Sequence, residues 1–219
     1  MLETKELLSL DKSLAGEFLS SFAYPWQTLS SIKGLILEIG KGLSEEEYTS
    51  PTENVWIHKS ATVAPTAYIG APCIIGENTE VRHCAFIRGS ALIGKSCVVG
   101  NSTEIKNAIL FDNVQVPHYN YVGDSILGYK SHMGAGSVTS NVKSDKTPVV
   151  LRSENERYET GLKKFGAILG DYVEVGCNSV LNPGTVIGRN TNIYPLSSVR
   201  GEIPADSIYK SAEKIVSKE

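Results

Sequence analysis

Bulky apolar residues recur at every sixth position along much of the chain. Ten successive positions of this phase carry one: Ile57, Val63, Ile69, Ile75, Val81, Ile87, Ile93, Val99, Ile105 and Phe111. The phase returns later at Leu169, Val175, Leu181, Ile187, Ile193 and Val199. A period of six fits neither an α-helix nor an ordinary strand. It is typical of a parallel β-helix, in which each unit supplies a short strand and a turn and stacked units share one inward column. The pattern therefore predicts a mainly β chain, with a β-helix over residues 51–204.

A different period precedes the repeats. Apolar residues spaced by three and four run from Leu7 to Phe22 and again from Leu29 to Ile39, separated by Tyr24-Pro25-Trp26. This spacing predicts two short helices that form a hairpin. Because the open end of a β-helix exposes core and unpaired strand edges, we expect residues 1–50 to form a helical cap.

Three segments depart from the repeat. The inward positions after Phe111 step by five and six, and irregularity inside a repeat array is where function is often found. Residues 142–166 are charged and leave the repeat, which predicts an extruded loop. Residues 205–219 form a polar, Lys-rich tail in which we expect one last short helix, from Ala205 to Ser217.

Composition narrows the function. The net charge is −3 and the pI is about 5.9, so the chain lacks the basic footprint of a nucleic-acid-binding protein. The four cysteines show no metal-binding spacing and are expected as reduced core or corner residues. The N-terminal residues do not resemble a signal peptide, and no apolar run is long enough to span a membrane. We therefore expect a cytoplasmic protein.

Two basic residues, Arg88 and Lys106, are separated by three repeat units, and each follows a residue of the repeat. If three repeats make one coil, they stack on neighbouring coils, where like charges are unfavourable. Either an anion such as a phosphate lies between them or both side chains splay into solvent.

Polar landmarks cluster from residue 100 to residue 141. They are Gly100-Asn101, Glu104, Lys106, His118, Tyr121, Gly123-Asp124, Met133-Gly134-Ala135-Gly136, Thr139 and Asn141, preceded by Arg88-Gly89. This run resembles the left-handed β-helix family of hexapeptide-repeat acyltransferases. Within that family it is similar to the acetyltransferase domain of the bifunctional enzymes that acetylate glucosamine 1-phosphate and then uridylylate the product. The resemblance covers about residues 55–200. The loop with Thr160-Gly161 and Lys163-Lys164 resembles archaeal-type sugar-phosphate nucleotidylyltransferase/acetyltransferases.

The resemblance implies a reaction and a role for each matched residue. His118 would be the general base that takes a proton from the sugar amine as the amine attacks acetyl-CoA, and Glu104 would orient it. Arg88 and Lys106 would hold the sugar phosphate. The acceptor or acyl group would contact Tyr121, His132 and Asn141. Acetyl-CoA is the implied cosubstrate, and no metal is required. The residues implied along CoA are Ala135, Gly136, Asn141, Cys177 and Pro195.

The resemblance also implies a homotrimer with sites between subunits, reached by Asn141 or by the 142–166 loop of a neighbour. The chain departs from the family at His132, Val142, Cys177 and Pro195, which leaves the amino sugar and the affinity for CoA open. Only about 50 residues precede the repeats, too few for a nucleotide-binding domain. We therefore expect no uridylyltransferase activity.

Two other functions compete with an N-acetyltransferase. The same departures favour a non-catalytic protein that binds a sugar phosphate or a nucleotide sugar. A zinc carbonic anhydrase built on the same helix needs three histidine ligands, two of them close in sequence. The four histidines contain no such pair, which disfavours that function: His58, His83, His118 and His132.

Overall fold

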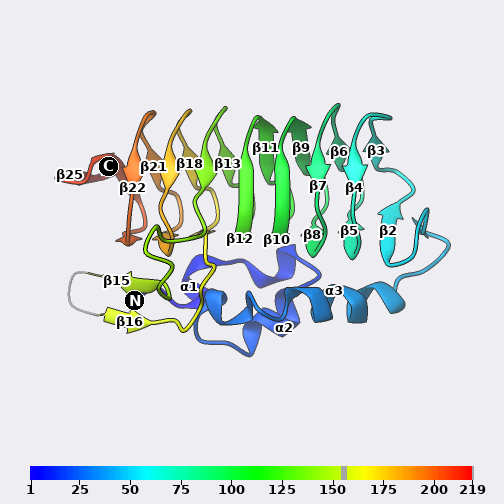
Figure 1. Cartoon of the computed structure of the whole chain (residues 1–219), viewed down its shortest axis with the longest axis horizontal. Coiled ribbons are helices and arrows are strands. Elements are labelled where there is room, and N and C mark those ends of the chain that lie inside the picture. The colour runs from blue at the N-terminus through cyan, green and yellow to red at the C-terminus, as the bar shows by residue number, and fades with distance from the viewer. Residues whose placement is uncertain (154–156, 219) are drawn as a thin grey trace.

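Short parallel strands stack in three rows and close into a β-helix (Figure 1). The structure is a computed structural model that describes residues 1–153 and 157–218. Face 1 consists of β2 (Val55–His58), β5 (Cys73–Ile75), β8 (Ala91–Ile93), the ends of β10 (Glu104–Leu110) and β12 (Tyr121–Leu127), β17 (Ala167–Leu169), β20 (Thr185–Ile187) and β23 (Glu202–Ile203). Face 2 consists of β4 (Tyr68–Ile69), β7 (Phe86–Ile87), the starts of β10 and β12, β14 (Val138–Thr139), β19 (Val180–Leu181) and β22 (Ser198–Val199).

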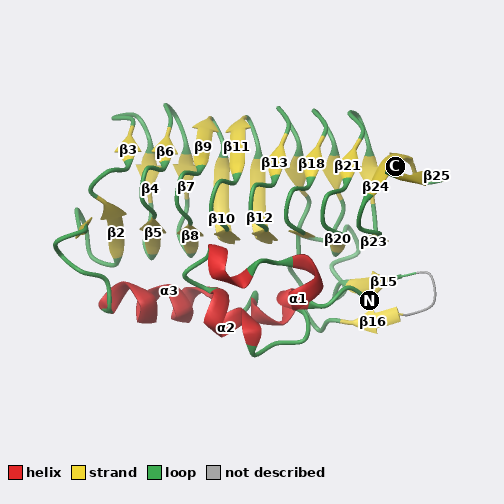
Figure 2. Ribbon diagram, turned by 180° about the vertical axis from the view of Figure 1, so that it is seen from behind, coloured by secondary structure: helices red, strands yellow, loops and turns green. Residues whose placement is uncertain are grey.

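Face 3 lies on the far side (Figure 2). It consists of β3 (Thr62–Val63), β6 (Glu80–Val81), β9 (Val98–Asn101), β11 (Gln115–His118), β13 (His132–Met133), β18 (Glu174–Val175), β21 (Asn192–Ile193) and β24 (Ser207–Ser211). The pairing register shows that three repeats make one coil, since Val55 pairs with Cys73 and Cys73 with Ala91. The predicted fold, a left-handed parallel β-helix of hexapeptide repeats, is confirmed.

The predicted inward column forms the core of the β-helix. Its members from Ile75 to Ile105 are buried, and so are Val116 and Val122. On face 1 the inward position predicted for Phe111 is taken by Leu110, which pairs with Ile93. In the first coil Ile57 and Ile69 are only partly buried, and Val63 is exposed over 36% of its surface. Its strand β3 pairs only with β6 among the described strands, so no further coil covers it.

Two successive coils are one residue short of three full repeats. Ala91 pairs with Ala108, and Ala108 pairs in turn with Ser125. The missing residue belongs to the corner between faces 2 and 1, so β10 and β12 run round that corner without a break. Asn107 and Asp124 make the bend with φ angles of 48° and 49°. Asn and Asp tolerate this left-handed conformation better than other residues with a side chain.

The N-terminal helices lie along the flank of the β-helix and do not cap its end (Figure 1). They are α1 (Thr4–Leu7), η1 (Leu10–Lys12), α2 (Gly16–Ser20), η2 (Pro25–Thr28) and α3 (Ile32–Lys41). Helix α3 packs on β5, β8 and β10, and η2 contacts β12. Residues 1–50 are therefore helical but do not lie where the expected cap would lie. The first expected helix is divided into the short pieces α1, η1 and α2.

The outward side of face 1 explains this placement. It presents a second apolar column, and all its members are buried: Ile74, Leu92, Ile109, Ile126, Ile168 and Val186. Strands that are apolar on both sides must be covered on both sides. The apolar stripes of the helices bury this column, and Trp26 stacks on Phe165 with 6.1 Å between ring centroids.

Each end of the β-helix is finished by an antiparallel strand. β1 (Tyr48–Thr49) pairs with β2, and β25 (Lys214–Ser217) pairs with β24. The expected helix from Ala205 to Ser217 is thus a β-hairpin. Its outer strand satisfies the backbone groups that face 3 would otherwise leave open at its edge.

The loop predicted over residues 142–166 lies in an insertion within one coil. Ile126 pairs with Ile168, so this coil is more than twice as long as three repeats. The insertion contains the hairpin of β15 (Val150–Arg152) and β16 (Arg157–Glu159). Its base is anchored by the buried side chains of Val149, Leu151 and Phe165. Within residues 1–153 and 157–218, no helix is long and apolar enough to cross a membrane.

Candidate active site

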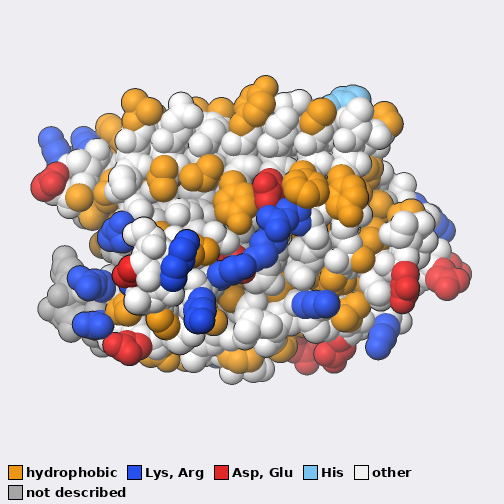
Figure 3. Space-filling model, viewed as in Figure 1, with side chains coloured by type: hydrophobic (Ala, Val, Ile, Leu, Met, Phe, Trp, Pro, Cys, Tyr) orange, Lys and Arg blue, Asp and Glu red, His pale blue; other side chains and the backbone are white. Residues whose placement is uncertain are grey.

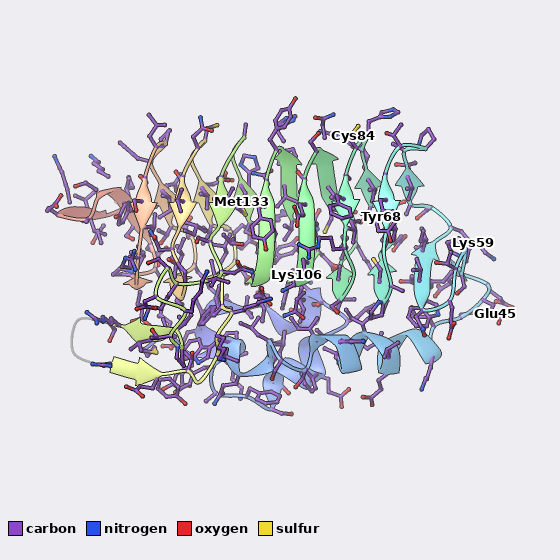
Figure 4. The ribbon with its side chains drawn as sticks, viewed as in Figure 1. Glu45, Lys59, Tyr68, Cys84, Lys106 and Met133 are labelled. Atoms are coloured by element: carbon purple, nitrogen blue, oxygen red, sulfur yellow. The ribbon has the colours of Figure 1, made fainter. Side chains whose placement is uncertain are left out.

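A cluster of charged and amide side chains occupies face 2 and the shortened corner beside it. Arg88 Nη1 lies 2.8 Å from Glu104 Oε1, and Lys106 Nζ lies 2.9 Å from Asp124 Oδ2. The cluster sits where β10 bends from face 2 toward the helical flank, at the position of Lys106 in Figure 4. Four of the residues expected here, Arg88, Glu104, Lys106 and Tyr121, are brought together.

Asp124 is the centre of this cluster, although no role was predicted for it. Its side chain is only 6% exposed. Its carboxylate accepts hydrogen bonds from Lys106 Nζ, from Asn107 Nδ2 at 3.0 Å and from the amide of Asn141. The sequence contains a pattern that could have revealed this role. Asn107, Asp124 and Asn141 are equally spaced, and each interval is one residue shorter than three repeats.

The carboxylates correct the expected stacking of like charges. Arg88 and Lys106 do lie on neighbouring coils, but Glu104 and Asp124 neutralise them one by one. Their proximity therefore needs no bound anion. The Arg88–Glu104 pair is well exposed and adds little to stability, whereas the Lys106–Asp124 pair is mostly withdrawn from solvent.

Tyr121 and Asn141 complete the cluster from the next two coils. The Asn141 amide donates to the Tyr121 hydroxyl at 3.1 Å as well as to Asp124. Asn141 thus contacts the cluster of its own chain. Burial raises the pKa of Tyr121, and the nearby carboxylates of Asp124 and Glu104 add to this effect. The phenol therefore remains a hydrogen-bond donor throughout the neutral pH range.

His118 stands at the other edge of face 2, at the corner where β11 ends. Its backbone is fixed, because its N–H donates to Asn120 Oδ1 at 3.1 Å and its carbonyl accepts from the Gly136 N–H at 3.0 Å. Asn120 is itself buried and donates to the Gly134 carbonyl. The imidazole is exposed and has no hydrogen-bond partner within residues 1–153 and 157–218. Glu104 does not orient it, because that carboxylate pairs with Arg88 instead.

The residues expected along CoA follow His118 on the same corner. Asn178 N–H donates to the Ala135 carbonyl at 2.8 Å, and Leu196 N–H donates to the Cys177 carbonyl at 2.9 Å. His118, Ala135, Cys177 and Pro195 therefore stand one above another on successive coils, and we call this row the His118 column. Gly136 borders it with a φ of 72°, a left-handed conformation that favours glycine.

His132 is not brought into either group. It begins β13 on the outer side of face 3, where its Nδ1 lies 2.8 Å from Glu174 Oε2. The expected contact of His132 with the acceptor is therefore unsupported by its position. When the His132 imidazole is protonated, it forms an ion pair with Glu174 on the next coil, and this contact explains the position of the side chain.

Comparisons with known proteins identify the repeats. The family model "Bacterial transferase hexapeptide (six repeats)" matches residues 54–89, and the model "GMPPB C-terminal domain" matches residues 90–190. The chain belongs to the hexapeptide-repeat family of left-handed β-helix proteins.

Curated relatives narrow the resemblance. The bifunctional protein GlmU of Methanococcus maripaludis is 33% identical over 202 residues, which cover 91% of this chain and 49% of the relative. A bifunctional sugar-1-phosphate nucleotidylyltransferase/acetyltransferase of Sulfurisphaera tokodaii is 30% identical over 48% of this chain and 26% of its own length. The chain thus spans about half the length, or less, of these two curated relatives. The predicted resemblance to this group of bifunctional enzymes is confirmed.

Solved structures give a weaker likeness. PerB from Caulobacter crescentus, solved with CoA and GDP-perosamine, covers 74% of this chain and 56% of its own at 18% identity and a TM-score of 0.40. The acetyltransferase domain of PglB from Neisseria gonorrhoeae covers 87% and 66% at 15% identity and a TM-score of 0.35.

Proposed function

We propose that the protein is a CoA-dependent N-acetyltransferase that acts on an amino-sugar phosphate such as glucosamine 1-phosphate. One observation carries this proposal: the two edges of face 2 hold complementary halves of a transferase site. One edge has the cluster around Asp124, and the other begins the His118 column. The relatives that are named as acetyltransferases or as GlmU agree with this assignment.

Each half has a task in the reaction. The cations Arg88 and Lys106 would bind the sugar phosphate, and Tyr121 and Asn141 would orient the sugar. The donor would lie along the His118 column, where its thioester meets the amine. The amine nitrogen attacks the thioester carbonyl and His118 accepts the amine proton. The C–S bond then breaks, and His118 returns the proton to the departing sulfur, so that CoA leaves as a thiol. An imidazole suits this role because it exchanges protons near neutral pH.

The assay measures release of the CoA thiol from acetyl-CoA in the presence of glucosamine 1-phosphate. Turnover that needs both substrates supports the proposal. Saturable binding of the sugar phosphate without turnover, across a panel of amino sugars, would instead support a non-catalytic binding protein. The side chains of Cys177 and Pro195 in the His118 column favour that second function, since both differ from the small residues of the family.

The same column makes a prediction for cysteine chemistry. Cys84 and Cys177 are exposed, whereas burial raises the pKa of the Cys73 and Cys97 thiols to about 12. At pH 8 we expect iodoacetamide to modify only the exposed pair, because the thiolate is the reactive form. Saturating acetyl-CoA, whose sulfur is blocked as a thioester, should protect Cys177 and leave Cys84 reactive, as peptide mass spectrometry would show. Equal labelling of Cys177 with and without acetyl-CoA would remove this residue from the donor path.

We also propose that the protein works as a homotrimer. Face 2 exposes apolar side chains around the site: Tyr68 is 58% exposed, Phe86 is 43% exposed and Val180 is 37% exposed (Figure 3). An apolar surface beside a polar site is typical of an interface. A second copy placed there would cover the exposed imidazole and the cluster together. Light scattering tests this directly, and a monomer at assay concentration would contradict it.

A further inference from the structure

A groove of about 680 Å³ lies beside the inserted hairpin, and the proposed transfer reaction does not use it. One wall consists of residues from the insertion, Lys143, Arg152, Arg157 and Glu159, and the other comes from the coils beyond it, at Gly184 and Arg200. Figure 3 shows Lys and Arg side chains gathered over this part of the molecule.

The lining of this groove is strongly basic. Among the described residues that line the groove, four cations face one carboxylate, on a chain whose net charge is −3. That carboxylate, Glu159, forms an ion pair with Arg157 at 3.1 Å. Lys143 forms an ion pair with Asp145, which does not line the groove. Arg152 and Arg200 have no carboxylate partner among the residues that the structure describes, although Arg200 donates to the Asn182 side-chain oxygen at 3.0 Å. Such a concentration of one charge favours an anionic ligand.

The groove is built into the fold at its base. Gly201 approaches the hairpin so closely that a Cβ on it would lie 2.8 Å from the Arg152 carbonyl oxygen, and a Cβ on Gly184 would lie 2.6 Å from Val149. Both glycines have positive φ angles, 80° at Gly184 and 79° at Gly201. The Gly184 N–H also donates to the Phe165 carbonyl at 3.1 Å. These close approaches place the backbone of Arg152 beside the coil that carries Arg200.

The position of the groove connects it with the acceptor half of the site. Val138 pairs with Val180 and Val180 with Ser198, so the corner that holds Asn141 continues to Pro183 and then to Gly201. Neighbouring coils are ~4.8 Å apart, which places Arg200 about 10 Å beyond the level of Asn141. A nucleotide-linked sugar held by Tyr121 and Asn141 would therefore direct its diphosphate toward Arg152 and Arg200, whereas the phosphate of a simple sugar phosphate would lie on the other side of the cluster, at Arg88 and Lys106.

We propose that this groove binds the diphosphate of a nucleotide. The planar donors of arginine match phosphate oxygens, and two arginines that lack a carboxylate partner among the described residues can each take one phosphate. Both a nucleotide-linked amino sugar and CoA contain this chemistry. The groove lies on the acceptor corner, whereas the His118 column lies on the opposite edge of face 2, so the acceptor is the source that the geometry favours. This assignment of the source rests on the proposed function, whereas binding itself does not.

Calorimetry with uridine diphosphate and with inorganic pyrophosphate tests the binding. The variant with both Arg152→Ala and Arg200→Ala should raise Kd at least ~10-fold, because it removes two charge-assisted contacts. The matched control is Arg82→Ala, a partly exposed arginine on face 3 that pairs with Glu80 at 3.0 Å, and it should leave Kd unchanged. Circular dichroism verifies that the variants are folded. A wild type that binds neither probe, or a control that weakens binding equally, would overturn the proposal.

Steady-state kinetics distinguish the two sources. With UDP-glucosamine as acceptor, the double variant should raise the KM of the acceptor at least ~10-fold relative to the KM of acetyl-CoA. A selective rise in the KM of acetyl-CoA would overturn the acceptor assignment. Binding of the probes without any acetyl transfer would reject the proposed function and leave the groove in place. Acetyl transfer that the double variant does not affect would support the proposed function and reject the groove as a binding site.

Discussion

The substitution His118→Ala is expected to lower kcat for acetyl transfer by about 10²- to 10⁴-fold, the usual contribution of a positioned general base. The backbone around His118 is held by Asn120 and Gly136, so the loss of an exposed imidazole should not disturb the corner. The KM values for both substrates should change little, because no other contact depends on this side chain. Thiol release under saturating substrates measures the effect.

The fitting control for this variant is His83→Ala. His83 stands on the same corner two coils earlier, is exposed, and contacts Thr66 Oγ1 at 2.9 Å. It offers the same type of side chain at the same type of position but lies before the proposed site. We expect full activity from this variant. An active His118→Ala enzyme would exclude His118 as the base, and equal losses in both variants would indicate damage to the corner.

The substitution Asp124→Asn should weaken both the site and the fold. The carboxylate accepts hydrogen bonds from three donors, and an amide in its place would turn an NH₂ group toward at least one of them. Lys106 would also lose its counter-charge while largely buried, with 23% of its side chain exposed. We expect the free energy of unfolding to fall by ~1–3 kcal/mol. The KM for the sugar phosphate should rise more than ~10-fold.

Two further variants separate these effects. Asp112→Asn alters another partly buried carboxylate, which accepts from the Lys95 N–H at 2.7 Å far from the site, and it should affect stability without changing KM. Adding Lys106→Met to Asp124→Asn removes the unpaired cation, so stability should recover in part while sugar-phosphate binding stays lost. Urea unfolding and substrate kinetics on the same samples provide both readouts. Normal KM in Asp124→Asn would show that the cluster is structural.

The fold was predictable because a single column determines it. The repeat from Ile57 to Ile105 forces one inward residue per unit, and the insertion after Asn141 is visible as a charged break in the sequence. The inward column alone could not place the helices. The residue just before it, from Ile74 through Leu92 to Ile109, is also apolar on face 1, and that second column requires a cover along the side.

The site was predictable only in part, because the resemblance supplied residue types and not their pairing. The positions of Arg88 and Lys106 followed from the repeat, but the carboxylates that neutralise them depend on which coils become neighbours. Asp124 belongs to a row that appears only where a coil loses one residue. His132 illustrates the opposite error, since a matched position on the outer side of face 3 finds its partner in Glu174 and not in the site.

The flanking helices also bear on how this molecule loses its structure. A linear array whose coils touch only their neighbours can fray from either end and unravel step by step. Here the N-terminal segment adds contacts that connect coils far apart along the array. Helix α3 rests on β5 near one end, the Leu7 carbonyl accepts from the Asp171 N–H at 3.0 Å, and the Leu2 N–H donates to Glu202 at 2.6 Å near the other end. The N-terminal segment thus works as a longitudinal brace, and it makes the whole array one cooperative unit.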